Sequence, residues 1–183
     1  MHPNRDMAAI AVFRSPQIVG EAVAEPEGKG TRLRATFTAL PHGKHGFHIH
    51  VAGDLRGEGC AGACAHLHMG GGVVRHGGRP THRGTRRGVA QERHSGDLGN
   101  VELRGKKASY SYFLADVKPE DLWGRSLIVH ADADDLGHGP HEDSGTTGHS
   151  GARIGCAIFG RGAACSGRQT RRRTRRQQQQ QRA

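Results

Sequence analysis

The chain has 183 residues, of which 29 are glycine and only 4% are aromatic, a composition that favours short strands and loops over helices. No segment reaches the ~20 apolar residues of a membrane-spanning helix, and the N-terminus lacks the charged-then-apolar pattern of a secretory signal. These observations argue against a membrane protein and predict a cytoplasmic one.

The positive charge lies mostly at the C-terminus. The formal net charge is +10, but residues 161–183 contain eight arginines and no acid, which leaves about +2 for residues 1–160. The C-terminal segment has low complexity and no apolar periodicity, so we expect one folded domain over residues 1–160 and a disordered Arg/Gln-rich tail over residues 161–183. Such a tail contacts polyanions nonspecifically or directs a protein to the nucleus. No aromatic residue interrupts the arginines, which argues against a dedicated nucleic-acid platform.

Alternating apolar and polar residues predict about eight short strands. In chain order they cover residues 8–14, 18–24, 32–40, 45–51, 100–103, 109–114, 126–131 and 154–159. Two long loops rich in glycine and histidine lie between them, at residues 53–96 and 132–152. Unstructured stretches of this length in a compact domain are usually functional or disordered. The pattern predicts an all-β antiparallel sandwich or barrel with two long functional loops.

The fourth predicted strand contains the first candidate site. Successive residues of a strand point to opposite faces, so His48 and His50 share one face. Phe47, Ile49 and Val51 share the other face and can enter a core. Two imidazoles on one strand are half of a ligand set for copper or zinc. The alternative interpretation is an exposed patch of histidines.

Further ligand-type residues follow along the chain. His66, His76 and His94 with Asp97 would provide three imidazoles and one carboxylate, a four-coordinate set that zinc accepts. His130 stands near the end of an apolar strand. Each histidine by itself is more often a surface or structural residue, but their joint order strongly indicates a metal site.

Six segments that hold these residues resemble the copper/zinc superoxide dismutase family. They are GFHIH (46–50), AHLH (65–68), RHGG (75–78), RHSGDLGNV (93–101), VHADADDLG (129–137) and TGHSGARIGC (147–156). The resemblance extends over roughly residues 8–160, and RHSGDLGNV is its most specific part. It implies a Greek-key antiparallel sandwich and an enzyme that converts superoxide to dioxygen and hydrogen peroxide by Cu(II)/Cu(I) cycling.

The resemblance also implies one copper and one zinc ion per subunit. The copper ligands that it implies are His48, His50, His66 and His130. The zinc ligands that it implies are His66, His76, His94 and Asp97, so that His66 bridges the two metals.

Other roles follow from the same resemblance. Asp134 corresponds to the carboxylate that hydrogen-bonds one ligand of each metal, and Arg153 to the guanidinium at the mouth of the copper channel. His66 is the expected proton donor. Cys60 and Cys156 correspond to the disulfide that ties the metal loop to the last strand.

The chain departs from the family pattern in both loops. The first loop has a basic insert over residues 79–87, in which His82 is either a competing ligand or, more simply, a solvated side chain. His68 replaces the usual asparagine after the bridging histidine and has the same two interpretations. The second loop keeps its acids but has Asp132 and Thr146 where lysines usually stand, so we expect Arg153 to carry most of the attraction for superoxide.

Two cysteines lie outside the disulfide that the resemblance implies. Cys64 and Cys165 are expected to be free thiols in a reducing cytoplasm. The alternatives are disulfide exchange of either one with Cys60 or Cys156 and a copper-binding role for Cys64. Trp123 is either an anchor of a homodimer interface or a half-exposed loop residue. A copper chaperone is a further expected partner.

Two other functions compete with the enzyme. One is an inactive metal-binding relative, and the other is a domain of a copper chaperone. The chain has no CxC or CxxC copper-transfer motif, and this argues against the chaperone.

Overall fold

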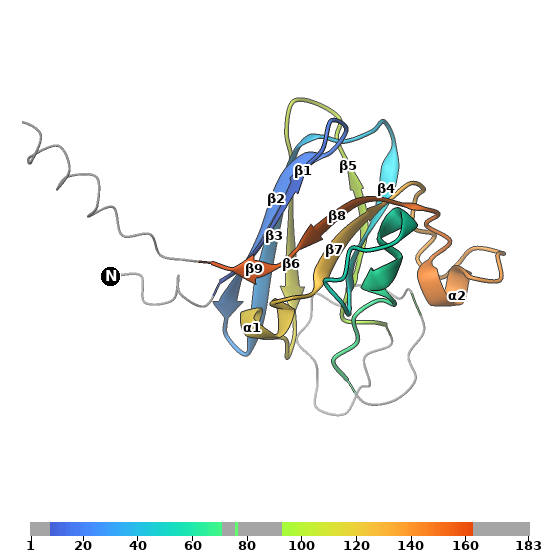
Figure 1. The fold of residues 1–183 in the computed structure, drawn as a ribbon. Helices are drawn as coiled ribbons and strands as arrows, with labels where there is room; N and C mark the ends of the chain where they lie inside the picture. Colours follow the sequence, from blue (N-terminus) through green and yellow to red (C-terminus); the bar gives the residue numbers. More distant parts are fainter. Residues whose placement is uncertain (1–7, 71–75, 77–92, 163–183) are drawn as a thin grey trace, which may run out of the picture.

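A computed structural model of the protein describes residues 8–70, 76 and 93–162 (Figure 1). In these residues nine strands form two antiparallel sheets. The first sheet has the order β6-β3-β2-β1-β9, with β1 (Ala9–Arg14), β2 (Val19–Glu27), β3 (Gly30–Ala39), β6 (Ala108–Leu114) and β9 (Gly160–Arg161). The second has the order β5-β4-β7-β8, with β4 (Lys44–His50), β5 (Asp97–Glu102), β7 (Ser126–His130) and β8 (Arg153–Ile158).

The strand order confirms the predicted Greek-key sandwich. β3 pairs with β6, and β4 pairs with β7, although neither pair is consecutive in the chain. The eight predicted strands all occur, and the ninth is the two-residue β9, which pairs with β1. The helices in the described residues are one short 3-10 segment, η2 (Glu58–Ala63), and two single turns, α1 (Pro119–Leu122) and α2 (Ser144–Thr147). None of these is long and apolar enough to cross a membrane.

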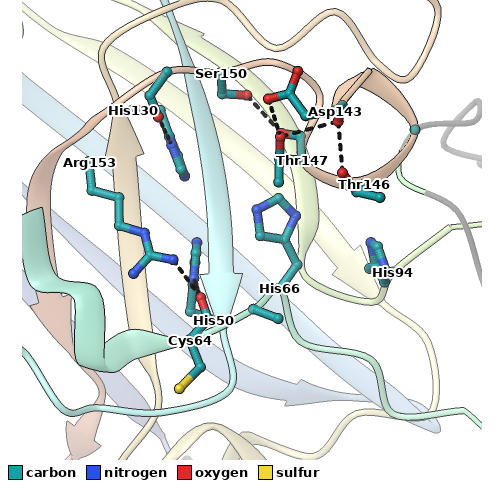
Figure 2. Close-up of a pocket in the computed structure, with 13 residues that line it drawn as sticks. His50, Cys64, His66, His94, His130, Asp143, Thr146, Thr147, Ser150 and Arg153 are labelled. Carbon is teal, nitrogen blue, oxygen red and sulfur yellow. Dashed lines mark hydrogen bonds between the residues drawn. The ribbon is translucent and has the colours of Figure 1, made fainter. Parts of the chain in front are cut away.

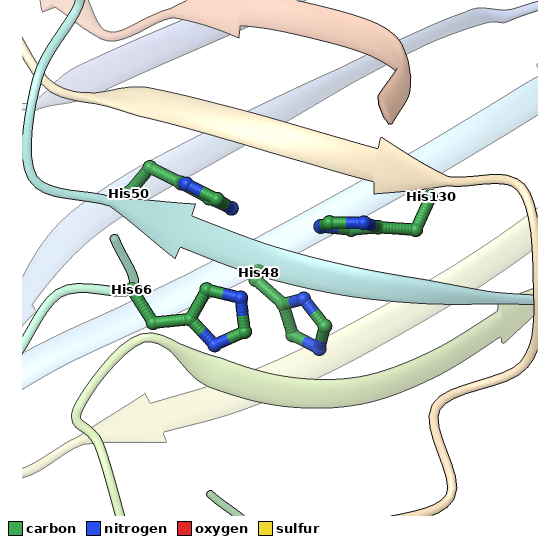
Figure 3. A group of neighbouring side chains, drawn as sticks. All are labelled: His48, His50, His66 and His130. Atoms are coloured by element: carbon green, nitrogen blue, oxygen red, sulfur yellow. The ribbon is translucent and has the colours of Figure 1, made fainter. Parts of the chain in front are cut away.

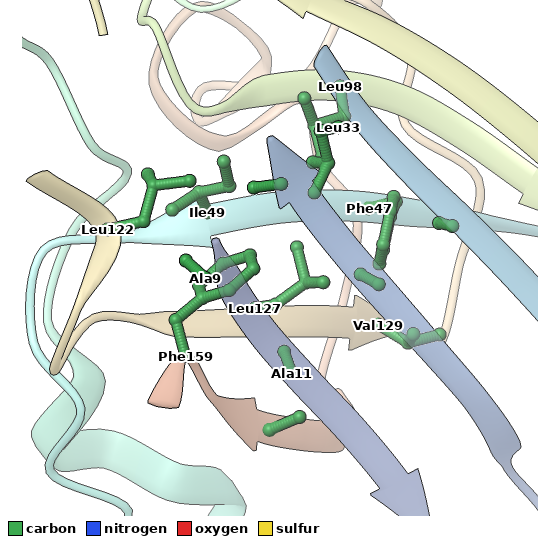
Figure 4. Packing of buried hydrophobic residues seen from close by; sticks show 14 of the residues in the cluster. Ala9, Ala11, Leu33, Phe47, Ile49, Leu98, Leu122, Leu127, Val129 and Phe159 are labelled. Atoms are coloured by element: carbon green, nitrogen blue, oxygen red, sulfur yellow. The ribbon is translucent and has the colours of Figure 1, made fainter. Parts of the chain in front are cut away.

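The core lies between the two sheets and is built from alternate residues of the strands (Figure 4). In β3, Leu33, Ala35 and Phe37 are fully buried, while Arg34 between them is exposed and Thr36 is half-buried. Three phenylalanine rings meet in the interior, with the centroids of Phe37 and Phe47 5.6 Å apart in an edge-to-face arrangement. Small alanines on β1 and β2 leave room for these rings, since a close-packed core must match large side chains with small ones.

Strand β4 is buried on both faces. Phe47 and Ile49 enter the core, as predicted, with no exposed surface. His48 and His50 point to the opposite face, yet they are only 0% and 1% exposed, so they do not form a surface patch. The prediction that Val51 joins the core is wrong: it is 38% exposed, because β4 ends at His50 and the alternation ends with it.

The predicted disulfide is present. Cys60 in η2 is bonded to Cys156 in β8 with an S–S distance of 2.07 Å, which ties the first loop to the second sheet. Cys64 is a free, exposed cysteine. The basic insert with His82, Cys165 and the Arg/Gln-rich tail from residue 163 lie outside the described residues.

The substitution Phe47→Ala should lower the free energy of unfolding by about 3–5 kcal/mol, because it leaves a cavity between the sheets beneath the two histidines. Urea denaturation of the metal-free protein measures this loss. Val12→Ala, at an exposed position of β1, serves as the control and should change stability by less than about 1 kcal/mol. An equal effect of the two substitutions would contradict the packing described here.

Candidate metal centre

Four imidazoles form a buried cluster on the outer face of β4 (Figure 3). Strand β4 contributes His48 and His50, the end of β7 contributes His130, and the loop after η2 contributes His66, which is joined to His50 by an isolated β-bridge. One nitrogen from each ring lies within 4.8 Å of the corresponding atoms of the others. The structure thus brings together four histidines that are up to 82 positions apart in the sequence.

In three of the four rings, one nitrogen is hydrogen-bonded to another group of the protein and the other nitrogen has no hydrogen-bond partner. His50 Nδ1 bonds the carbonyl of Cys64 at 2.9 Å, His130 Nδ1 bonds the carbonyl of Gly151 at 3.2 Å, and His48 Nε2 lies 2.9 Å from Asp134 Oδ2. These acceptors require the hydrogen on the bonded nitrogen, which leaves a lone pair on the other nitrogen.

The free nitrogens are His48 Nδ1, His50 Nε2 and His130 Nε2. All three are buried without a hydrogen-bond partner. A buried polar atom left unpaired costs about 1–3 kcal/mol, so three in one cluster need an explanation. Converging neutral imidazoles are a donor set that suits copper, and the cluster therefore fits the metal that the sequence predicts for it.

A second group adjoins the first through His66. Asp97 Oδ1 lies 2.9 Å from His66 Nδ1 and 3.1 Å from His76 Nδ1, and Asp97 Oδ2 lies 3.2 Å from His94 Nδ1. Three imidazole nitrogens and one carboxylate oxygen are a donor set that zinc accepts. His68, the stray candidate, belongs to neither group: its ring centroid is 6.2 Å from that of His94, and both its nitrogens lack a partner.

Asp134 connects the two groups. Its Oδ2 accepts from His48 Nε2 at 2.9 Å and its Oδ1 accepts from His76 Nε2 at 2.8 Å, with no part of the carboxylate side chain exposed. The carboxylate is fixed in turn by Asn100, whose Oδ1 accepts from the Asp134 backbone N–H at 2.7 Å. Asp134 therefore sets the ring orientation of one histidine in each group, as outer carboxylates of metal sites commonly do.

A pocket of about 570 Å³ leads to the first group (Figure 2). His50, His66 and His130 line it together with Arg153, Asp143 and Thr147. The Arg153 guanidinium donates to the carbonyl of Cys60 at 2.7 Å and to that of Cys64 at 2.5 Å.

The carbonyl of Cys64 accepts from Arg153 as well as from His50. This contact was not predicted, because every residue has a carbonyl and the sequence carries no signal for its use.

Comparison with known proteins agrees with this geometry. Residues 18–159 match the sequence profile of copper/zinc superoxide dismutase, which is more than half of the chain. The chain belongs to the copper/zinc superoxide dismutase family. A Cu-Zn superoxide dismutase of Paramecium bursaria Chlorella virus 1 is 38% identical over 165 residues, which cover 87% of this chain and 81% of the viral protein.

Two further relatives support the assignment. A protein of Orgyia pseudotsugata multicapsid polyhedrosis virus, provisionally named a Cu-Zn superoxide dismutase, is 43% identical over 126 residues, covering 66% of this chain and 75% of its own. The crystal structure of the clock protein EA4 matches with a TM-score of 0.70 and 29% identity, covering 86% of this chain and 96% of that one. Sequence comparison and structural comparison therefore agree that the chain has the copper/zinc superoxide dismutase fold.

Burial determines the charge of the histidines in the first group of this dismutase. Removal from water lowers the pKa of His50 to about 2, that of His130 to about 3 and that of His66 to about 4. The pKa of His48 is lowered by the same cause, against the opposing effect of Asp134. These rings are consequently neutral at pH 7 and can offer lone pairs to a metal.

His76 behaves in the opposite way. Burial acts to lower its pKa, but hydrogen bonds to Asp134 and Asp97 outweigh burial and raise the pKa to about 9. For the two carboxyl groups burial acts to raise the pKa, and the bonds from the histidines hold it well below the usual range. Without a metal, an imidazolium at His76 balances these carboxylates, and a bound cation would displace its proton.

The metal-free protein should be most stable near pH 6.5. For His50, His66 and His130 the folded pKa is depressed, so the unfolded chain takes up more protons below pH 6.5 and stability falls with acidification towards pH 4. For His76 the folded pKa is raised, so its contribution is complete below pH 6.5 and is lost as the pH rises through about 9. Midpoints of urea unfolding measured between pH 4 and 10 test the predicted loss of stability on both sides of pH 6.5. A midpoint that rises steadily from pH 6.5 to pH 9 would contradict the His76 assignment.

Proposed function

We propose that the protein is a superoxide dismutase in which the first histidine group holds copper and the second holds zinc. The observation that carries this proposal is the set of three buried, unpartnered imidazole nitrogens that face His66. In the overall reaction two superoxide anions and two protons give one dioxygen and one hydrogen peroxide. The site contains one group for each metal, so one copper and one zinc ion per subunit is the expected content.

Copper would supply the one-electron redox chemistry when bound, and His66 belongs to the ligand groups of both metals. The chain would contribute His48, His50, His66 and His130 to copper and His66, His76, His94 and Asp97 to zinc. Asp134 would keep His48 and His76 in the required tautomers. Neutral imidazoles suit a site whose metal changes charge, because they bind both oxidation states.

Arg153 is the proposed binding group for the substrate. Its guanidinium is a permanent, planar cation at the wall of the pocket and is held by two backbone carbonyls. Among the described residues no carboxylate forms an ion pair with it. Superoxide is a small anion and would be drawn to this charge. His66 is the proposed proton donor for the peroxide product, since its ring lies in the same pocket.

Substitution of single histidines should remove one metal or both, according to the group to which each histidine belongs. His76→Ala should abolish most zinc binding and leave copper bound, His50→Ala should do the reverse, and His66→Ala should weaken both. Metal analysis of proteins loaded with both ions, together with a superoxide dismutation assay, measures these effects. His42→Ala, an exchange of a histidine outside the cluster, is the control and should retain both metals.

The same experiment separates the proposal from an inactive metal-binding relative or a copper-chaperone domain, which the family match does not favour. A fully loaded wild-type protein without dismutase activity would overturn the proposed function. Full activity of His48→Ala would overturn the site.

Arg153→Ala should slow the reaction about tenfold at low ionic strength and should flatten its dependence on salt, because the anion loses its attracting cation. Superoxide decay after pulse radiolysis measures the bimolecular rate constant. Arg56→Ala is the matched control, since Arg56 pairs with Asp54 on the surface and does not line the pocket. A wild-type rate that is flat in salt and unchanged by Arg153→Ala would contradict this role.

A homodimer is the proposed assembly. Val51, which follows β4, and Ile158 in β8 are exposed apolar residues, and Gly53 is packed against Gly124 and Ile158. Trp123 precedes Gly124 in the chain; its indole N–H donates to the Ala8 carbonyl at 3.2 Å, and Arg161 lies 5.2 Å from the ring centroid. Analytical ultracentrifugation tests the proposal, and a monomer at micromolar concentration would refute it.

A cytoplasmic or nuclear location, a copper chaperone as partner and polyanion contacts of the tail are also proposed. They rest on the sequence alone.

A further inference from the structure

The loop that carries α2 places a pair of histidines beside the mouth of the pocket. The rings of His141 and His149 are stacked, with centroids 3.6 Å apart and an angle of 11° between the planes. His149 Nδ1 lies 2.7 Å from Asp143 Oδ1, and Asp143 lines the pocket. The two rings are thus linked directly to a charge that an incoming anion meets.

Asp143 and Arg153 give the pocket mouth charges of opposite sign. In Figure 2 Arg153 lies to the left of His66 and Asp143 lies above it. The hydrogen bond from His149 is the main cause that lowers the pKa of Asp143, so this carboxylate stays ionised. For superoxide, Asp143 therefore opposes the attraction of Arg153.

The other charged groups around the pair are few among the described residues. Glu142 and the exposed His138 belong to the same loop. Behind the loop, Asp135 Oδ2 accepts from Ser144 Oγ, which itself bonds the backbone N–H of His141. Across the pocket stands Arg153. The charged groups named around the pair are thus acidic except for one arginine.

We propose that the His141–His149 pair controls the access of superoxide by taking up one proton, which cancels the charge of Asp143 at the pocket mouth. The inference rests on the proposed dismutase function and adds to it residues that touch neither metal group. It assigns a role to two histidines that the sequence resemblance left without one.

The geometry explains why one proton is involved. Imidazole is the side chain that ordinarily changes its charge between pH 5 and 8. Two positive rings at 3.6 Å would repel each other strongly, so the proposal involves one proton for the pair and not two. A unit charge about 10 Å from the path of a monovalent anion, in a solvent-like medium, changes its local concentration about twofold.

Rate measurements on the metal-loaded protein test the role of the pair. At low ionic strength the wild-type bimolecular rate constant should be about twofold higher at pH 6 than at pH 8.5. The double substitution His141→Asn with His149→Asn should remove this rise. Asn is suited to position 149, where φ is 47°, because it tolerates the left-handed region. Asp143→Asn should give at pH 8.5 the rate that the wild type reaches at pH 6.

His138→Asn is the matched control, because it removes an exposed imidazole of the same loop that has no part in the stack. It should retain the wild-type pH profile. A double variant that keeps the rise, or a His138→Asn protein that loses it equally, would overturn the proposal.

A measurement that does not depend on activity separates this proposal from the proposed function. NMR titration of the zinc-loaded protein should show His141 and His149 sharing one proton, with uptake shifted to lower pH by Asp143→Asn. Independent titration of the two rings, unaffected by Asp143→Asn, would overturn the pair. Shared uptake in a fully loaded protein without dismutase activity would instead refute the proposed function, and the access role would fall with it.

Discussion

The burial of β4 on both faces is the constraint on which the rest of the structure depends. One face supplies Phe47 and Ile49 to the core between the sheets, and the other presents His48 and His50 to the metal centre. β4 lies between β5 and β7, so its backbone is held by ladders on both sides. The core therefore fixes the position of the two imidazoles, because a shift of this strand by one residue would exchange histidines for phenylalanine and isoleucine.

Hydrogen bonds attach the two loops to this strand. Each joins a histidine or Arg153 to an acceptor, either the Asp134 carboxylate or the Cys64 carbonyl, that belongs to one of the loops. Asp134 holds His48 and His76, and the Cys64 carbonyl holds both His50 and Arg153. The disulfide between Cys60 and Cys156 adds a covalent link between η2 and β8. Arg153, at the start of β8, consequently has its orientation coupled to that of a proposed copper ligand, and the proposed anion site is linked to the proposed redox site through one carbonyl.

The second loop gives the family fold a different set of side chains at the pocket. It presents no lysine to the pocket but has Asp143, Thr146 and Thr147 there, with the stacked His141 and His149 behind Asp143. In the proposed role of the histidine pair the charge of this rim depends on protonation, whereas a rim that contains lysines is positive throughout the physiological range.

The sequence by itself determined the fold class and the candidate ligands. Alternation located the strands, and the order of histidines from His48 to His130, with the resemblance that it carries, indicated the metal groups. Local pattern was misleading at Val51, where the strand ends, and it contains no information on the Cys64 carbonyl or on the stack of His141 with His149. Only the tertiary structure decided which nitrogen of each ring is free and which charge faces the pocket. The physical reason is that hydrogen-bond partners and solvent exposure arise from residues that are distant in the chain and meet only when the two sheets and their loops are packed together.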